Sequence, residues 1–444
     1  MYGIYQLIYF LSYGSVGSYS PYIPVLFSSY GIPSSILGLA FACGTLCTTL
    51  ISPLLCVIAD TYTLHSTLAR LSILASILSR LLIIPAAKST HSLNVILSTS
   101  LNSICNSTFS PLFDAKVVSM LPNSSDYGKF RLWGAIGFGC CVFISGFLID
   151  LYSNSSNLHE STLASRFIHS KFDIAIYLGL LLLISVLPFC FCIDFTPNKS
   201  ISHPDPVNSD SNHTFELIES HEQGDSDLED NDNIVLENTS TQRRSEFHSF
   251  WQWMTDIHVV VFFLILLISG LGNGMIETFL FVRLNELGAT SRVLGISRLL
   301  MCLGELPFFH YNEQLVSRFG VFGVLGIVQC AYCVRFFWYS VLQNPWNVVY
   351  VEVLHGITYG ALWGTSSVFA HQIAPAGLEA TAQSLVGLIH WGIGFTLGST
   401  LGGVLYEHVG AVNTFRCGLI ITTFTFITTC VFKLIYSERS HSRR

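Results

Sequence analysis

Several ionisable side chains fall inside strongly apolar stretches in the second half of the sequence, and six of them could act together. They are Glu277, Arg298, Glu305, Arg335, Glu352 and His355. In a membrane helix such a group is costly unless it meets a partner of opposite charge or a water-filled cavity. Two interpretations stay open. The residues are either structural ion pairs that hold helices together, or a proton relay in which a carboxylate gains and loses a proton as its arginine partner is released and engaged.

The spacing of these residues favours pairing between helices. Arg298 and Glu305 are seven residues apart, so they share one helix face about two turns apart. At a rise of about 1.5 Å per residue, the carboxylates of Glu277 and Glu352 lie at a depth similar to that of the guanidinium groups of Arg298 and Arg335. We expect these four groups to neutralise one another, and for Arg335 we favour the structural interpretation.

His355 follows Glu352 by one helical turn, on the same face. Because imidazole titrates near neutral pH, this side chain could pass a proton or contact a bound solute.

The composition is that of a membrane protein. Of the 444 residues, 51% are hydrophobic and 11% are charged, whereas soluble domains carry about 25% charged residues. Each apolar stretch is long enough to cross a bilayer, which takes roughly 20 helical residues. The twelve stretches are 4–27, 35–59, 66–86, 91–116, 130–152, 173–195, 256–281, 290–312, 320–341, 346–372, 380–406 and 411–436.

An even number of crossings puts both termini on one side of the membrane. Lys and Arg outside the crossings are more frequent on that side, so we expect the termini and the central loop to be cytoplasmic. The sequence leaves open whether the membrane is the plasma membrane or an endomembrane.

The central loop divides the chain into domains. We expect an N-terminal six-helix bundle at 1–195, an acidic, disordered cytoplasmic linker at 196–255, a C-terminal six-helix bundle at 256–436 and a short basic tail at 437–444. The overall charge of −7 comes from the linker, so it says nothing about a partner of the membrane body, and we expect no nucleic-acid partner. The linker is either a solvated connection or a regulatory segment that uses its serines.

No pattern for a cofactor is present. The thirteen cysteines are scattered through apolar stretches, without a disulfide framework or metal-binding spacing. No Gly-rich phosphate loop with a lysine occurs, which argues against ATP hydrolysis. We therefore expect no cofactor, no metal and no enzyme activity.

Several strings resemble a known family. They are EVLHGITYGALWG at Glu352–Gly364, IAPAGLEATAQSL, GSTLGGVLYE, YGKFRLWGAIGFG, LNELGATSRVLGISRLL and GELPFF. The chain resembles the major facilitator superfamily, in the branch around major facilitator superfamily domain-containing protein 6 and the lactose-permease-like symporters. The resemblance covers nearly the whole chain apart from the central loop. It implies an all-α membrane protein of twelve transmembrane helices in two six-helix halves around a central site.

The resemblance also implies a secondary active transporter that works by alternating access. We expect proton-coupled symport of a small polar solute, such as a sugar, a nucleoside or an organic acid, by a chain that is a monomer. The proton-coupling network would be Glu277, Arg298, Glu305, Glu352 and His355. The solute cavity would contain Tyr9, Tyr13, Asn102, Asn106, Tyr359, Trp363 and His390, although the tyrosines, amides and histidine also suit packing between helices. Two alternatives are an uncoupled facilitator and a transporter-like receptor or scaffold.

Three further residues are candidates for gating. Asp60 matches the acidic position of the superfamily's GxLADRxGRR loop, but Cys56 replaces the glycine and Thr61 the arginine. Arg70, farther along, could substitute for that arginine. Asp114 and Arg131 lie near the inner ends of their helices, where they could hold one face shut or simply anchor the helices.

One sequon, Asn154–Ser155–Ser156, falls in a loop on the side opposite the termini. We predict glycosylation of Asn154.

Overall fold

The structure is a computed structural model that describes residues 2–121, 127–154, 168–196, 252–375 and 378–441, and these ranges contain helices and no strand. Most of the predicted linker lies outside them. The first half contains the helices α1 (Tyr2–Tyr19), η1 (Ser20–Tyr22), α2 (Ile23–Ser29), α3 (Ser34–Thr61), α4 (His65–Leu81), α5 (Ile83–Ser89), α6 (Ser92–Met120), α7 (Tyr127–Asn154) and α8 (Asp173–Cys192).

The second half repeats the six crossings with more breaks. Its helices are α10 (Ile257–Glu286), α11 (Ser291–His310), α12 (Asn312–Phe319), α13 (Val321–Val341), η5 (Pro345–Val348), α14 (Val349–Glu352), η6 (Gly356–Ala361), α15 (Leu362–Ile373), α16 (Glu379–Gly387), η7 (Leu388–Phe395) and α17 (Thr396–His441). Both η6 and η7 are π-helical turns, a form that is frequent at functional sites.

In the described ranges, eight helices are long and apolar enough to span a membrane by themselves. The other crossings are broken, polar or joined. The first is broken at Tyr19, where Pro21 starts a 3₁₀ turn, and the tenth is divided among α14, η6 and α15. The fourth, α6, carries amide and hydroxyl side chains along its length. The last two crossings are joined: the eleventh runs through α16, η7 and the first part of α17, and the twelfth is the rest of α17 after its turn at Gly410 (φ 79°).

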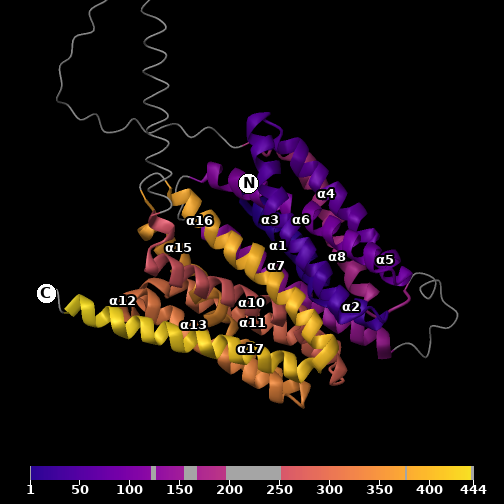
Figure 1. The fold of residues 1–444 in the computed structure, drawn as a ribbon. Helices are drawn as coiled ribbons and strands as arrows, with labels where there is room; N and C mark the ends of the chain where they lie inside the picture. The colour runs from indigo at the N-terminus through magenta and orange to yellow at the C-terminus, as the bar shows by residue number, and fades with distance from the viewer. Residues whose placement is uncertain (1, 122–126, 155–167, 197–251, 376–377, 442–444) are drawn as a thin grey trace, which may run out of the picture.

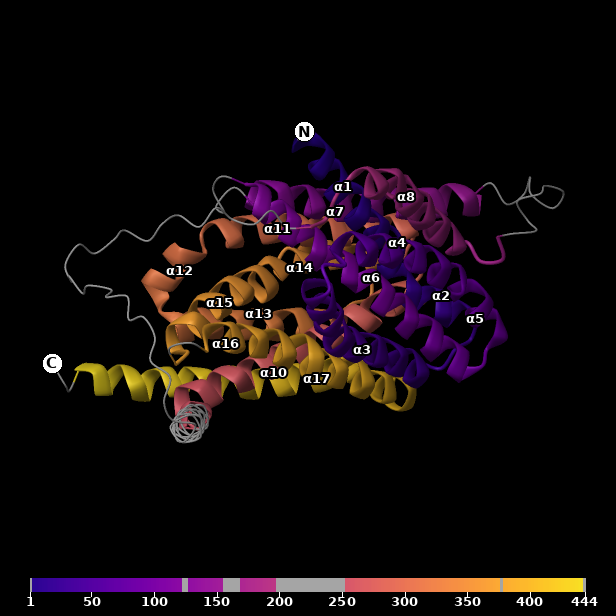
Figure 2. The ribbon, with the colours of Figure 1, turned by 90° about the horizontal axis from the view of Figure 1, so that it is seen from above.

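The helices of the two halves of the chain lie side by side (Figures 1 and 2). They meet most closely where α3 crosses α17 and where α7 crosses α11. Glycines permit both crossings: a Cβ at Gly38 would lie 2.2 Å from the carbonyl oxygen of Ser399, and one at Gly146 would lie 2.3 Å from that of Ser291. Both contacts are at the ends of the helices opposite the N-terminus of α1, so the halves converge at that end.

Candidate functional site

A cavity of about 650 Å³ lies between the two halves. The first half contributes side chains of α1 and α7, and the second half contributes α10, α11, η6, η7 and His355. The lining extends to Tyr127 at the start of α7 and to Phe309 near the end of α11. These residues are at the ends of their helices far from the glycine contacts, so the cavity extends away from the end where the halves converge.

Glu277 and Arg298 form an ion pair on the cavity wall. One terminal nitrogen of Arg298 donates to both carboxylate oxygens of Glu277 at 2.7 and 2.6 Å. The Arg298 side chain is 6% exposed and that of Glu277 is 23% exposed. The pair expected from equal depth is therefore formed, and its carboxylate is open to the cavity.

Glu305 occupies the same wall with a different partner. Its Oε1 atom lies 3.3 Å from Nε2 of His355, and its side chain is 21% exposed. Within the ranges that the structure describes, no lysine or arginine forms an ion pair with Glu305. This carboxyl group is thus the acid of the cavity whose charge no neighbouring guanidinium offsets directly.

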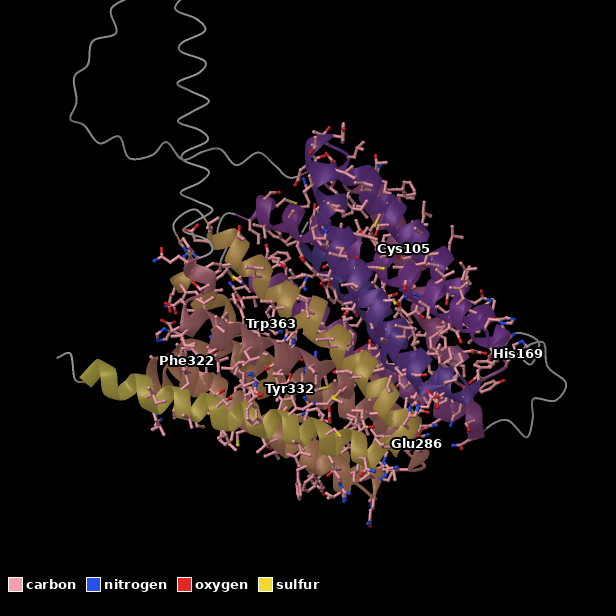
Figure 3. The ribbon with its side chains drawn as sticks, viewed as in Figure 1. Cys105, His169, Glu286, Phe322, Tyr332 and Trp363 are labelled. Carbon is pink, nitrogen blue, oxygen red and sulfur yellow. The ribbon has the colours of Figure 1, made fainter. Side chains whose placement is uncertain are left out.

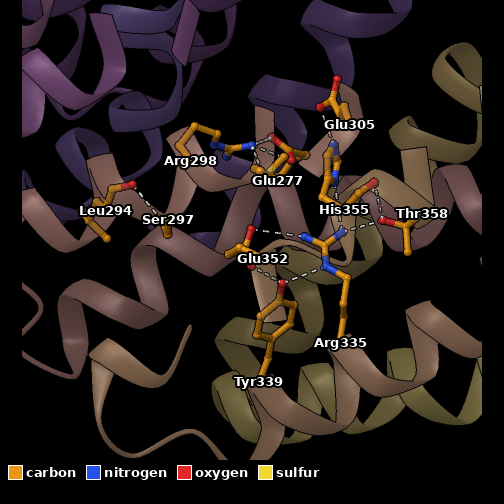
Figure 4. Close-up of polar contacts among 11 residues, drawn as sticks. Glu277, Leu294, Ser297, Arg298, Glu305, Arg335, Tyr339, Glu352, His355 and Thr358 are labelled. Atoms are coloured by element: carbon orange, nitrogen blue, oxygen red, sulfur yellow. Dashed lines mark hydrogen bonds and ion pairs between the residues drawn. The ribbon is translucent and has the colours of Figure 1, made fainter. Parts of the chain in front are cut away.

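Arg335 lies behind the wall in a dry cluster (Figure 4). A terminal nitrogen approaches Glu352 Oε2 at 3.4 Å, and the two side chains are 0% and 1% exposed. Its Nε atom donates to the Tyr339 hydroxyl at 3.0 Å, and that hydroxyl donates a short hydrogen bond to Glu352. Neither Arg335 nor Glu352 lines the cavity. Their arrangement is that of a structural ion pair between α13 and α14.

The Arg335 cluster also fixes the protonation of His355. Arg335 donates to Nδ1 of His355 at 3.1 Å. A guanidinium has only donors, so Nδ1 must accept and the imidazole must be the neutral form with its proton on Nε2. That Nε2 atom is the one that lies 3.3 Å from Glu305. In this state His355 carries its N–H on the side of Glu305 and has no free lone pair with which to take up a proton.

The first half holds a second charged cluster. Arg131 pairs with Asp114 at 2.9 Å, and Tyr9 donates to the same carboxylate at 2.6 Å. Tyr13 shares a 2.6 Å hydrogen bond with Ser110, and the Arg131 guanidinium stacks 4.7 Å above the Tyr13 ring. Arg131 and Tyr13 line the cavity, whereas Tyr9 is fully buried behind them. The Asp114–Arg131 pair joins α6 to α7 within one half and does not bridge the two halves.

Asn102 and Asn106, which were expected in the solute cavity, donate hydrogen bonds to the Tyr19 hydroxyl at 2.8 and 3.1 Å. Arg80 stacks 4.0 Å above the Tyr19 ring and donates to Ser15 Oγ at 2.5 Å. These contacts hold α1, α4 and α6 together. Asn106 lines a separate pocket of about 100 Å³, so the structure places both amides away from the main cavity.

The aromatic residues of the second half divide between wall and interior. Tyr359 and Trp391 line the cavity, with ring centroids 6.2 Å apart. Trp363 packs edge-on against His390 among the helices of the second half (Figure 3). His390 is fully buried, and its Nδ1 lies 3.3 Å from the Leu266 carbonyl oxygen. Trp363 and His390 therefore pack behind the wall rather than facing the cavity.

The predicted gating loop has different contacts from those expected. Asp60 is 74% exposed and pairs with His65 at 2.8 Å. Arg70 donates to the Cys190 carbonyl oxygen at 3.0 Å, so it does not replace the motif's arginine beside Asp60. Nearby, Asp194 accepts hydrogen bonds from Ser66 and from the backbone and side chain of Thr196, which lower the pKa of its carboxyl to about 2.

Asn154, the predicted glycosylation site, is the exposed last residue of α7. The two serines of its sequon lie outside the described residues.

Asn273 is a wall residue that the sequence analysis did not select. It precedes Glu277 by one turn on α10 and faces the same cavity. The four-residue spacing of the two polar side chains on one helix face was the available signal. Trp391, next to His390, was also missed.

Comparisons with known proteins identify the family. The sequence profile of the MFS_1 like family matches residues 2–417. The chain belongs to this family, within the major facilitator superfamily. Mouse major facilitator superfamily domain-containing protein 6-like is 29% identical over 135 residues, which cover 30% of this chain and 23% of that protein. Maltose permease of Geobacillus stearothermophilus is 28% identical over 134 residues, covering 30% of this chain and 34% of the permease. The chain thus aligns with 23% and 34% of the length of these two relatives.

Solved structures of the superfamily share the fold over nearly the whole chain. The nucleoside transporter NupG has a TM-score of 0.69 at 16% identity and covers 98% of this chain and 98% of its own. A D-xylose-proton symporter has a TM-score of 0.62 at 12% identity, with 96% and 97% covered. The family match and the apolar helices therefore make the chain a multi-pass membrane protein of the major facilitator superfamily.

Proposed function

We propose that the protein is a proton-coupled symporter that moves a small polar solute by alternating access. The cavity lies between two six-helix halves, at the place where a solute could be exposed to one side of the membrane and then to the other as the halves rock. The wall combines charged, amide and aromatic side chains with apolar ones, which suits a polar solute with a ring. The names of the nucleoside and sugar transporters with this fold make those two solute classes the first to test.

Glu305 is the proton-binding group of this proposal. It faces the cavity, and its nearest charged-type neighbour, His355, is neutral. A carboxylate without an ion-pair partner of its own changes the charge of the cavity when it is protonated. Protonation would also turn Glu305 from an acceptor only into a group that can donate as well, so proton binding and the polar contacts offered to the solute are linked.

The other charged residues take supporting roles. The Glu277–Arg298 pair lies on the wall and would contact the solute together with Tyr13, Arg131 and Tyr359. The Arg335–Glu352 pair would hold His355 in the orientation and protonation state that Glu305 requires.

The orientation is part of the proposal. With both termini cytoplasmic, the cavity extends toward the cytoplasm and the closed end faces the opposite side. The oligomeric state we propose is a monomer, because both halves of the cavity come from one chain.

The observation that carries this proposal is the cavity-facing carboxylate of Glu305, which lies 3.3 Å from the neutral imidazole of His355. The test is uptake of a panel of sugars and nucleosides by vesicles that contain the purified protein, with and without an imposed pH gradient. We expect the gradient to accelerate uptake of at least one solute, and Glu305→Gln to abolish this acceleration while leaving exchange of solute without a gradient.

The matched control is Glu313→Gln, which removes an exposed carboxylate of α12 away from the cavity. It should behave like the wild type. Uptake that ignores the gradient would indicate an uncoupled facilitator. If no solute moved and a partner protein bound instead, the receptor alternative would replace the proposal.

A further inference from the structure

A carboxylate of the first half binds the start of a helix in the second half. Asp150, near the end of α7, accepts hydrogen bonds from the backbone N–H groups of Ser291 and Arg292 at 2.8 and 2.9 Å. These are the first two residues of α11. Asp150 is 8% exposed, so both bonds are shielded from water.

The same arrangement occurs with the halves exchanged. Glu407, near the turn of α17, accepts a hydrogen bond from the backbone N–H of Ser35 at 2.9 Å. Ser35 is the second residue of α3. Each half therefore supplies one carboxylate to a helix N-terminus of the other half.

Neither helix is capped by its own N-cap side chain. Thr290, the N-cap of α11, makes no side-chain cap bond, and Pro33, the N-cap of α3, has no side chain that could make one. The first N–H groups of a helix lack intrahelical partners and carry a partial positive charge. The two carboxylates supply the missing acceptors and the opposite charge from across the interface.

Sequence repetition shows that the two contacts are equivalent. The strings SSILG at Ser34–Gly38 and SRVLG at Ser291–Gly295 begin the two helices. Each acid follows by four residues a glycine that allows close helix approach, Gly146 before Asp150 and Gly403 before Glu407. The number of residues from Gly146 to Gly403 is the same as the number from Asp150 to Glu407. One device is thus present twice, related by the repeat of the two halves.

We propose that Asp150 and Glu407 form a pair of latches that hold the converging end of the two halves shut and must open during the transport cycle. The inference rests on the proposed alternating access for its role in transport, but the latching itself is a property of the protein at rest. Asp150 is the stronger latch, because it accepts two shielded hydrogen bonds while Glu407 accepts one at an exposed site.

The test measures the separation of the halves directly. Fluorophores are introduced through encoded noncanonical amino acids at His91 and Gln343, which are exposed and lie in the two halves at the converging end. Single-molecule energy transfer then gives the ratio of shut to open molecules in the full-length protein, without solute or pH gradient. A protein that transported nothing would still report on the latches, so failure of the proposed function and failure of the latches remain distinguishable.

We expect Asp150→Ala to lower the ratio of shut to open molecules about tenfold or more, since hydrogen bonds to charged groups are among the stronger ones. Asp150→Asn should have a smaller effect because one acceptor oxygen remains. Glu407→Ala should also lower the ratio, but by less than Asp150→Ala does. In the double variant the two fold-changes in the ratio should multiply.

Asp173→Ala is the matched control. Asp173 accepts backbone hydrogen bonds from His169 and Ser170, both at 2.9 Å, but within the first half. This variant should leave the ratio unchanged. The proposal is overturned if Asp150→Asn and Glu407→Ala, which make the mildest changes, both give the wild-type ratio in folded protein.

Discussion

The guanidinium of Arg335 donates to Nδ1 of His355 over 3.1 Å, and this contact decides which nitrogen of the imidazole carries the proton. His355 thereby carries its proton on Nε2, the atom that lies 3.3 Å from Glu305. The residue types alone suggested one relay of five groups. In the structure these groups separate into a buried cluster around Arg335 and Glu352 and a cavity-facing acid, Glu305.

The buried Arg335–Glu352 pair leads to a prediction about stability. Arg335→Met leaves Glu352 buried without a cation, and we expect a loss of about 3–5 kcal/mol in unfolding free energy. The double variant Arg335→Met with Glu352→Met should recover most of this loss, because no charge remains unpaired. Thermal unfolding in detergent measures both. A double variant as unstable as the single one would contradict the structural role of this pair.

The wall pair makes a prediction about solute recognition. Glu277→Gln leaves the Arg298 charge facing the cavity, and we expect the KM for a neutral solute to rise about tenfold, equivalent to about 1.4 kcal/mol. Adding Arg298→Gln should restore part of the affinity by removing the unpaired charge. Initial rates of uptake over a range of solute concentrations provide the measurement. Identical KM values for wild type and Glu277→Gln would show that the solute does not approach this pair.

Tyr359 tests the aromatic wall. Its ring faces the cavity and stacks on His355 with centroids 5.3 Å apart. We expect Tyr359→Phe to keep most solute affinity and Tyr359→Ala to lose about tenfold, because the contact area of the ring is lost. Equilibrium binding of the transported solute is the readout. Trp363→Phe, behind the wall, is the control, and an equal loss there would indicate general loosening of the second half.

Gly146 tests the convergence of the halves. A side chain at this position meets the Ser291 carbonyl oxygen, so Gly146→Val should force the converging end apart. We expect the shut population in the energy-transfer measurement to fall by at least about tenfold, given that overpacking costs about 1–3 kcal/mol. Gly387→Ala, where no atom lies within 4 Å of an added Cβ, should have no effect. If Gly146→Val had the same proportion of shut molecules as the wild type, the close approach of α7 to α11 would be contradicted.

Asn154 tests the orientation. We expect protein made in eukaryotic cells to carry a glycan there, seen as a loss of apparent mass on glycosidase treatment and absent in Asn154→Gln. The central loop also contains a sequon, Asn212–His213–Thr214. A glycan on Asn212 would place that loop, and with it the termini, on the opposite side from our proposal.

The sequence was sufficient for the fold and for part of the wall. The rise per residue of a helix predicted that Glu277 and Arg298 lie at a similar depth, and in the structure they form an ion pair. It could not separate Glu305 from Glu352, because both are acids in apolar helices and only the packing of α13 decides which one is dry. Four-residue spacing likewise made Asn102 and Asn106 candidates for the solute cavity. In the structure both amides donate hydrogen bonds to the Tyr19 hydroxyl.

Asp150 and Glu407 escaped attention for another reason. They lie at helix ends, where charge is ordinary and needs no explanation. Their significance depends on which helix start lies opposite, and that information is tertiary. The repeated strings SSILG and SRVLG were the one local sign of it.

Gly410 joins the two arms of α17 without an intervening loop. The arm before it contacts α3 of the first half, and the arm after it packs along α13. Because a single residue connects the arms, we expect a shift of the first arm against α3 to be passed to the second. The C-terminal end of the chain would then report on the contact between the halves.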